Sequence, residues 1–335
     1  MIVRVEKQAG TRTMVLYPDQ ENRLKADEIE IANHYAGASL TEVMSVKGRY
    51  LLSPRIPFTP GYEFLGTVVR IGSGTKKFSL GDLVCGIVPH GGGYSSQVII
   101  KEKFAVLAGS MEKSIQVSAS IINYLTALEL LSPLVKRGIG GNVLIRGVAG
   151  GVGLAVLELG KIHNIRVYGT CSMQKKVTVE SRGGIWLDRN VSLQQQASKF
   201  PAKGFDVVMD AFGVVSFRDS IKFLKRGGTF CAYGFFGDLP PFMDAIIGVG
   251  YLLVRCLASF RKLHIVSVPA MVELSTKKYR KNLQEIVSYI QNSTIEIGPI
   301  EVFPISQVFE AHRKIEASEV VGKVVLDCRN QHSNI

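Results

Sequence analysis

The segment Gly147-Val148-Ala149-Gly150-Gly151-Val152-Gly153 decides the fold class of this 335-residue chain. It follows an apolar run at 143–146 that is typical of a strand, and it precedes residues with helical spacing at 154–162. A glycine-rich turn between a strand and a helix offers backbone N–H groups and the helix dipole to a pyrophosphate. Gly150 and Gly153 fit the second and third glycines of the G-x-G-x-x-G motif, and Val148 replaces the first. The predicted dinucleotide-binding turn consists of Ala149, Gly150, Gly151, Val152 and Gly153.

Strand-like and helix-like segments alternate after this turn. Further strands are predicted at 166–170, 184–187, 205–210 and 229–234. This alternation predicts βαβ units and a parallel sheet that is buried on both faces. The sequence therefore predicts an α/β protein with a Rossmann-type, doubly wound domain.

The flanking regions have a different pattern. Short strands separated by glycine turns are predicted at 29–32, 67–71, 83–87 and 96–100, followed by a helix at 117–131. The C-terminal part predicts a helix whose apolar face carries Tyr279, Leu283, Ile286, Val287 and Ile290. It also predicts a second helix with Ser306 as its N-cap and a last strand at 323–326.

Composition excludes several classes of protein. Hydrophobic residues make up 46% and charged residues 20%, which excludes a disordered chain. The net charge of +12 predicts a basic surface that would attract phosphates, nucleic acid or anionic lipid. A generally basic soluble enzyme is the favoured interpretation, because no run of Lys and Arg exceeds two consecutive residues. No RNP-type aromatic motif is present, so nucleic-acid binding is not favoured. Five scattered cysteines without a C-x-x-C pair argue against a disulfide framework or a four-cysteine zinc lobe. The N-terminus shows no signal or transit pattern, and a cytoplasmic protein is expected.

The region after the second predicted strand of the nucleotide domain indicates the type of nucleotide. An NAD site places an acid about 20 residues beyond the glycines to bind the ribose 2′-hydroxyl. Thr170 stands there instead, followed by Ser172, Lys175 and Lys176, and residues 170–176 contain no acid. Hydroxyls and lysines fit a 2′-phosphate better, so the predicted cofactor is NADPH.

Four ordered segments carry a family resemblance. They are Gly61-Tyr62-Glu63-Phe64-Leu65-Gly66 with Gly72-Ser73-Gly74 and Gly81-Asp82; Ala149-Gly150-Gly151-Val152-Gly153-Leu154; Phe205-Asp206-Val207-Val208-Met209-Asp210 with Gly213 and Gly227-Gly228-Thr229; and Val321-Gly322-Lys323-Val324-Val325-Leu326. Together they resemble the medium-chain dehydrogenase/reductase superfamily, in its zinc-independent, quinone-oxidoreductase-like branch.

The resemblance implies two domains. A GroES-like, β-rich catalytic domain would comprise 1–116 and the return segment 265–335, around a Rossmann domain at 117–264, with the active site in the cleft between them. Zinc-dependent relatives usually carry histidine where Tyr62 stands and a ligand cysteine near Ser39. Residues 119–125 contain neither Cys nor His, and only Cys85 lies near the structural zinc lobe. No metal site is therefore expected.

The resemblance also implies an activity. Zinc-free relatives transfer a hydride from NADPH to a quinone or to an α,β-unsaturated carbonyl, here called an enone. Ser39 stands where relatives often have Asn, and Glu42 where they have Asp. Ser39 and Tyr50 would donate hydrogen bonds to the substrate carbonyl, and Thr126 would lie near the nicotinamide; ordinary structural roles remain the alternative for all three. Phe212, Gly213 and Gly234 would contact the cofactor, while Asp188 would repel a 2′-phosphate unless the adjacent Arg189 compensates.

The segment at 235–262 is longer and more apolar than a Rossmann connection requires. Phe242 to Phe260 is apolar except for Asp244 and Arg255, and apolar residues on every side of a helix predict burial in protein or lipid. Three alternatives remain open: a wall of the substrate pocket or a homodimer contact, insertion at a membrane surface, or a loop that orders with substrate. The rival function is a nucleotide-binding, membrane-associated or scaffold protein with little catalysis.

Overall fold

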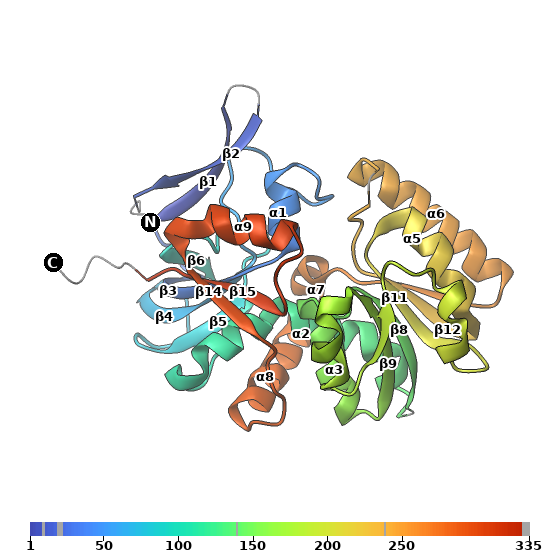
Figure 1. Cartoon of the computed structure of the whole chain (residues 1–335). Coiled ribbons are helices and arrows are strands. Elements are labelled where there is room, and N and C mark those ends of the chain that lie inside the picture. Colours follow the sequence, from blue (N-terminus) through green and yellow to red (C-terminus); the bar gives the residue numbers. More distant parts are fainter. Residues whose placement is uncertain (9–10, 19–22, 139, 238, 330–335) are drawn as a thin grey trace. The chain divides into compact units, whose positions relative to one another are not determined.

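The computed structural model describes residues 1–8, 11–18, 23–138, 140–237 and 239–329 (Figure 1). Its internal contacts divide the chain into two compact units. Unit 1 comprises Met1–Gly48, Leu52–Leu125 and Val268–Ile335, and unit 2 comprises Arg49–Leu51 and Thr126–Ser267. The first and the last described segments of the chain therefore belong to the same unit.

Unit 2 is built on a six-stranded sheet with the order β10-β9-β8-β11-β12-β13. Every neighbouring pair in it is parallel, and β8 lies in the middle with no exposed surface at Val143, Leu144 or Ile145. The strands are β8 (Gly141–Arg146), β9 (Ile165–Cys171), β10 (Ile185–Asp188), β11 (Phe205–Asp210), β12 (Leu224–Ala232) and β13 (Lys262–Ile265). The helices are α3 (Gly151–Ile162), α4 (Lys176–Glu180), α5 (Gly213–Ser220) and α6 (Pro241–Ala258), with short 3-10 turns η3 (Met173–Lys175), η4 (Gln194–Lys199) and η5 (Ile221–Phe223).

Unit 1 contains a seven-stranded sheet and a separate hairpin. The sheet order is β14-β15-β3-β4-β5-β7, with β6 paired to β3, and β1 pairs with β2. The strands are β1 (Ile2–Gln8), β2 (Thr11–Tyr17), β3 (Glu28–Ala38), β4 (Glu63–Ile71), β5 (Leu83–Ile87), β6 (Gln97–Lys101), β7 (Ala105–Leu107), β14 (Ile300–Pro304) and β15 (Lys323–Asp327). The helices are α1 (Leu40–Val46), α7 (Val268–Leu274), α8 (Thr276–Gln291) and α9 (Val308–Glu316), with 3-10 turns η1 (Glu102–Phe104), η2 (Met111–Lys113) and η6 (Ile305–Gln307). The helix α2 (Ser114–Val135) is divided between the two units.

The structure confirms the predicted parallel sheet and corrects one local prediction. Ser306 is not an N-cap, because it lies inside η6, and α9 begins at Val308 after Gln307. The apolar segment 242–260 lies largely in α6, and the three alternatives for its surroundings stay predictions. One side of α6 packs on unit 2, where Leu252 and Cys256 are buried, whereas the other side is exposed.

The described residues contain one helix that is long and apolar enough to cross a membrane, at Met111–Val135. Its most apolar window is 78% buried inside the protein. That degree of burial is typical of a core helix, and Ile121, Leu125 and Leu130 on α2 have no exposed surface.

Candidate nucleotide-binding and active site

The glycine-rich turn is fixed to the end of β9. Gly147 has a φ of +77°, which favours glycine, and the backbone N–H groups of Gly147 and Val148 donate to the Thr170 carbonyl at 3.0 and 3.1 Å. The Gly147 N–H also lies 3.2 Å from the Thr170 hydroxyl oxygen, which accepts from it. Thr170 therefore holds the turn in place from a buried position.

The glycines of the turn meet different surroundings. A Cβ at Gly153 would lie 2.3 Å from the Val148 carbonyl oxygen, so a side chain there cannot fit. Among the described residues, a Cβ at Gly150 would meet only the Gly147 carbonyl oxygen, at 3.5 Å. Gly150 has an ordinary φ of −83° as the N-cap of α3. Packing requires glycine at 153, whereas at 150 the absence of a side chain leaves the backbone open to a ligand.

Positive side chains gather at the end of β9. Ser172 is the N-cap of η3, which ends at Lys175, and the Arg189 backbone N–H donates to the Cys171 carbonyl at 3.0 Å. Burial raises the pKa of the Cys171 thiol, while Lys175 and Arg189 lower it, so both cations act at this end of the strand. The structure thus places Lys175 and Arg189 near the Cys171 thiol, and Ser172 is the next residue in the chain. Lys176 is directed elsewhere, because its ammonium lies 3.8 Å from Glu180 and 5.1 Å from the centre of the Trp186 ring.

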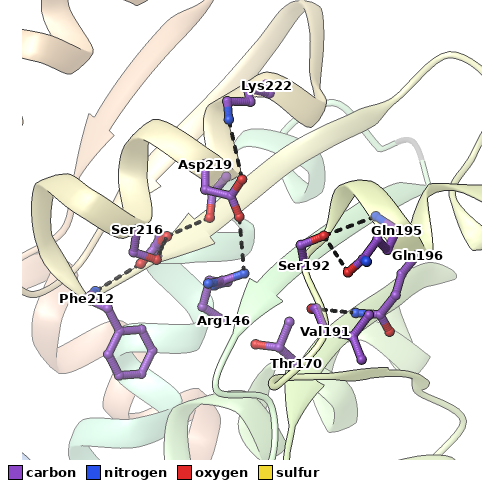
Figure 2. Close-up of polar contacts among 12 residues, drawn as sticks. Arg146, Thr170, Val191, Ser192, Gln195, Gln196, Phe212, Ser216, Asp219 and Lys222 are labelled. Carbon is purple, nitrogen blue, oxygen red and sulfur yellow. Dashed lines mark hydrogen bonds and ion pairs between the residues drawn. The ribbon is translucent and has the colours of Figure 1, made fainter.

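Asp188 is used by its own loop. Its carboxylate accepts from the Asn190 N–H at 2.9 Å, and its backbone N–H donates to the Gln196 side-chain oxygen at 2.8 Å. The Gln196 amide in turn donates to the carbonyls of Asp188 and Val191, and Figure 2 shows the contact with Val191. The carboxylate that the sequence places against a 2′-phosphate is therefore a loop-stabilising group.

Arg146 is a further cation that the sequence analysis did not single out. It ends β8 directly before Gly147, and its guanidinium lies 3.8 Å from Asp219, which also pairs with Lys222 at 3.6 Å (Figure 2). Its position immediately before the glycine turn was the signal in the sequence. The side chain is about one-quarter exposed, so it adds positive charge beside the turn.

Phe212 lies against the turn, and its neighbours explain two predicted glycines. A Cβ on Gly147 would lie 3.3 Å from the Phe212 ring, which is 41% exposed. Gly213 has a φ of +81° and a Cβ there would lie 2.0 Å from the buried carboxylate of Asp244 on α6. A Cβ on Gly234 would lie 2.7 Å from the Phe236 ring. Gly213 and Gly234 are thus required by packing, whereas Phe212 contacts the turn itself.

In unit 1, Ser39 is the N-cap of α1. Its hydroxyl accepts from the Thr41 N–H at 3.2 Å and donates to the Glu42 carboxylate at 2.6 Å, and that carboxylate also accepts from the Ser39 N–H at 2.9 Å. This capping box commits the only hydrogen of the Ser39 hydroxyl. Glu42 has no exposed surface, and burial raises its pKa.

A buried ion pair lies in the same unit. Lys323 on β15 contacts Glu63 on β4, with side chains 4% and 0% exposed, and the second Glu63 oxygen accepts from the Ile122 N–H at 3.0 Å. Lys323 also lowers the pKa of Glu42 against the effect of burial. The sequence analysis quoted both residues within motifs without assigning them a role. The signal was a charged residue inside an apolar strand, which requires a partner of opposite sign.

The remaining predicted residues occupy ordinary positions. Tyr62 is 3% exposed, its hydroxyl lies 3.4 Å from the Ser45 hydroxyl, and burial raises its pKa to about 12. Tyr50 is half-buried and belongs to unit 2, while Thr126 is buried in α2. Ser39 lies in unit 1, so the three predicted catalytic residues are divided between the units, and their common role stays a prediction.

Two family models match the chain. An alcohol dehydrogenase GroES-like domain matches residues 25–123, and a zinc-binding dehydrogenase family matches residues 188–326. The chain belongs to the medium-chain dehydrogenase/reductase superfamily. Within it, the chain falls in the quinone-oxidoreductase-like branch, and the predicted combination of a GroES-like part with a Rossmann-type sheet is confirmed.

Relatives in this superfamily cover most of the chain. A quinone oxidoreductase-like protein 2 homolog from Nematostella vectensis is 26% identical over 91% of this chain and 83% of its own length. A probable quinone oxidoreductase from Schizosaccharomyces pombe is 24% identical over 98% and 97%. The structure of Escherichia coli quinone oxidoreductase complexed with NADPH has a TM-score of 0.81 at 22% identity, covering 98% of this chain and 100% of that one.

One matched family is described as zinc-binding, but the described side chains of this chain do not form a zinc site. Within the part of the chain that the structure describes, no group of three or more His, Cys, Asp or Glu side chains is placed to hold a metal ion. Cys85 is buried beside Glu63, and both the burial and that carboxylate raise its pKa, which disfavours the thiolate that zinc requires.

Proposed function

We propose that this medium-chain dehydrogenase/reductase is an NADPH-dependent, zinc-independent oxidoreductase that delivers a hydride to a quinone or to the β-carbon of an enone. The turn at the start of α3, with cations at the end of β9, is the observation that carries this proposal. The nicotinamide supplies the hydride when the cofactor is bound. The residues of the chain hold the cofactor, orient the substrate and stabilise developing charge.

The turn fits a pyrophosphate. The first N–H groups of α3 have no partner within the helix, and the described first turn, residues 151–153, contains no acidic side chain to neutralise it. Gly150 leaves the approach open, and Phe212 covers the side of the turn at Gly147. Arg146 contributes positive charge beside it.

The end of β9 fits a 2′-phosphate. Residues 170–176 supply no carboxylate for a bare ribose, the Thr170 hydroxyl oxygen accepts from the turn, and the Asp188 carboxylate accepts from its own loop. Lys175 and Arg189 are cations that act at this end of the strand. A bound 2′-phosphate would accept hydrogen bonds from one or both of them.

Nucleotide titration tests this assignment. We expect NADPH to bind at least about tenfold more tightly than NADH, equivalent to roughly 1.4 kcal/mol. Lys175→Ala and Arg189→Ala should weaken NADPH binding selectively, while Lys176→Ala, which removes a side chain paired with Glu180 and Trp186, is the matched control. Equal affinities for NADPH and NADH in the native protein would overturn the cofactor assignment.

Ser39 and Glu42 suggest how the substrate carbonyl is polarised. While Glu42 is ionised, it holds the Ser39 hydrogen. Burial raises the Glu42 pKa and so favours the neutral carboxyl group, which donates its own proton to the Ser39 oxygen. The Ser39 hydrogen then becomes available to the substrate oxygen, where negative charge collects during hydride transfer.

Steady-state kinetics with one quinone and one enone test this role. Ser39→Ala and Tyr50→Phe should each lower enone turnover about tenfold to a hundredfold, or roughly 1.4–2.7 kcal/mol, with smaller effects on the quinone, which accepts hydride readily. Glu42→Gln should retain more enone turnover than Ser39→Ala, because its amide still donates to the Ser39 oxygen. Unchanged enone turnover in both Ser39→Ala and Tyr50→Phe would remove these residues from the mechanism.

A second candidate function is nucleotide binding with little catalysis. The Ser39–Glu42 hydrogen bond favours it, because a capping hydroxyl does not need to serve a substrate. Tight NADPH binding without oxidation by a panel of quinones and enones would support this candidate over the reductase. The homodimer stays a prediction, which light scattering of the purified protein checks.

A further inference from the structure

The outer side of α6 is a continuous apolar surface. Met243, Ile246, Gly250, Leu253, Leu257 and Phe260 follow each other at alternating spacings of three and four residues, which places them along one stripe of a helix and its C-terminal end. The large apolar side chains exposed here, hereafter the α6 face, are Phe242, Met243, Ile246, Ile247, Leu253, Val254, Leu257 and Phe260, with exposures from 40% to 78%.

The opposite side of the helix fixes it to unit 2. Leu252 and Cys256 are buried in the same core cluster as Phe217 and Phe230, and α6 lies along α5 (Figure 1). Asp244, the only acid in the helix, is 1% exposed and accepts from the Val214 N–H at 2.8 Å. The helix is therefore anchored by one side, and its apolar face is presented outward.

The backbone has a left-handed conformation at Phe260, at the C-terminal end of the α6 face. Phe260 has a φ of +53°, a conformation that a bulky residue rarely adopts, yet its ring is 71% exposed. The Arg226 guanidinium lies 4.6 Å from the centre of that ring. Phe260 is the residue after the C-cap Ser259, and the Arg261 N–H donates to the Cys256 carbonyl at 2.9 Å, so this left-handed residue ends α6 and leaves its ring at the end of the α6 face.

Cations surround the α6 face without exposed acids on the helix. Arg255 is exposed near the C-terminal end of α6, and Lys262 is exposed just beyond this helix. The Arg226 guanidinium lies over the Phe260 ring. The Arg218 guanidinium, on α5, lies 5.3 Å from the centre of the Tyr251 ring on α6. Apolar side chains bordered by arginine and lysine, with the only carboxylate of the helix turned inward, complement a surface that offers hydrocarbon and phosphate together.

We propose that the α6 face docks this protein on the surface of a membrane that contains anionic phospholipids. The apolar side chains enter the boundary between headgroups and acyl chains, and the surrounding cations pair with lipid phosphates. A second copy of the chain fits less well, because α6 has no exposed carboxylate to receive these cations. Docking does not depend on the proposed redox activity, and a catalytically inactive protein would dock equally.

Vesicle flotation of the full chain tests the proposal. We expect binding to phosphatidylcholine vesicles that contain phosphatidylserine, at least tenfold weaker binding to pure phosphatidylcholine vesicles, and weakening at high salt. Leu253→Glu with Leu257→Glu should abolish binding, and Arg226→Ser with Arg255→Ser should weaken binding to the anionic vesicles alone. Leu274→Glu is the matched control, because Leu274 is 85% exposed on α7 in unit 1.

Each outcome of this experiment supports or overturns the proposal. Unchanged thermal unfolding and NADPH binding would show that the α6 variants remain folded. Absence of vesicle binding by the native protein would overturn the proposal, and so would equal binding to both kinds of vesicle. A native dimer that does not bind vesicles and that Leu253→Glu with Leu257→Glu converts to a monomer would instead assign the face to a second copy.

Discussion

Alanine at Gly150 separates ligand binding from folding. The φ of −83° and ψ of 172° at this N-cap suit any residue, and within the described part of the chain the new Cβ would meet only the Gly147 carbonyl oxygen, at 3.5 Å. Replacing glycine by alanine at a compatible position stabilises by about 0.4–1 kcal/mol, because the unfolded chain loses freedom. Alanine is a poorer N-cap than glycine, which costs a similar amount, so the two effects nearly cancel.

The effect on NADPH should be large. The added methyl group would stand on the open side of the turn, where a pyrophosphate must approach the N–H groups of α3. We expect NADPH affinity to fall at least about tenfold, or roughly 1.4 kcal/mol, while the unfolding temperature of the ligand-free protein stays close to that of the native protein.

Gly153→Ala gives the contrasting result. Its Cβ would lie 2.3 Å from the Val148 carbonyl oxygen and 2.5 Å from the Val148 Cα, so the backbone must move. Overpacking of this kind costs about 1–3 kcal/mol, and the ligand-free unfolding temperature should fall. Fluorescence titration and thermal unfolding measure both variants. Native NADPH affinity in a folded Gly150→Ala protein would refute the placement of the pyrophosphate at this turn.

Three further outcomes are expected. Lys323→Met leaves the Glu63 carboxylate buried without its cation, and thermal unfolding should show a loss of about 3–5 kcal/mol, whereas Lys323→Arg should lose less. Burial lowers the pKa of His312 to about 4, below that of the unfolded chain, so the unfolded state takes up the proton first. Stability should therefore fall by up to about 3 kcal/mol from about pH 6.5 to about pH 4, and denaturant unfolding of His312→Gln should lack this part of the dependence. Elemental analysis should find no stoichiometric zinc, and one or two ions per chain retained after mild chelation would contradict the ligand argument.

The sequence predicted those parts of the fold that local patterns determine. The apolar run of β8, the glycine turn and the helix that follows are contiguous in the sequence. The strand predicted at 205–210 has the same bounds as the observed strand β11. The hairpin of β1 and β2 was not predicted. Its polar and apolar residues lack a clear signal, and its place depends on bridges to Ser95 and Phe58, far away in the sequence.

The site was predictable only where one segment forms it. The backbone N–H groups of Gly147 and Val148 in the turn find their hydrogen-bond acceptor about 25 residues further along the chain, at the Thr170 carbonyl. The pair of Glu63 and Lys323 joins residues 260 positions apart, and a single sequence does not show which buried cation meets which buried acid. For Ser39, the sequence indicated a polar group at the expected position. The hydrogen bond that its hydroxyl donates to Glu42 became visible only in the structure.

The α6 segment shows why hydropathy alone did not determine its environment. Its apolar content predicted burial in protein or lipid without showing which side of the helix faces the core, and one polar residue decides that side. Asp244 points inward because its carboxylate accepts from the Val214 N–H at the start of α5, and that contact fixes which side of α6 faces the core. The second Asp244 oxygen, which has no hydrogen-bond partner among the described residues, lies where a side chain at Gly213 would stand. The same carboxylate therefore shapes the segment that carries Phe212 beside the nucleotide turn and turns the apolar face outward.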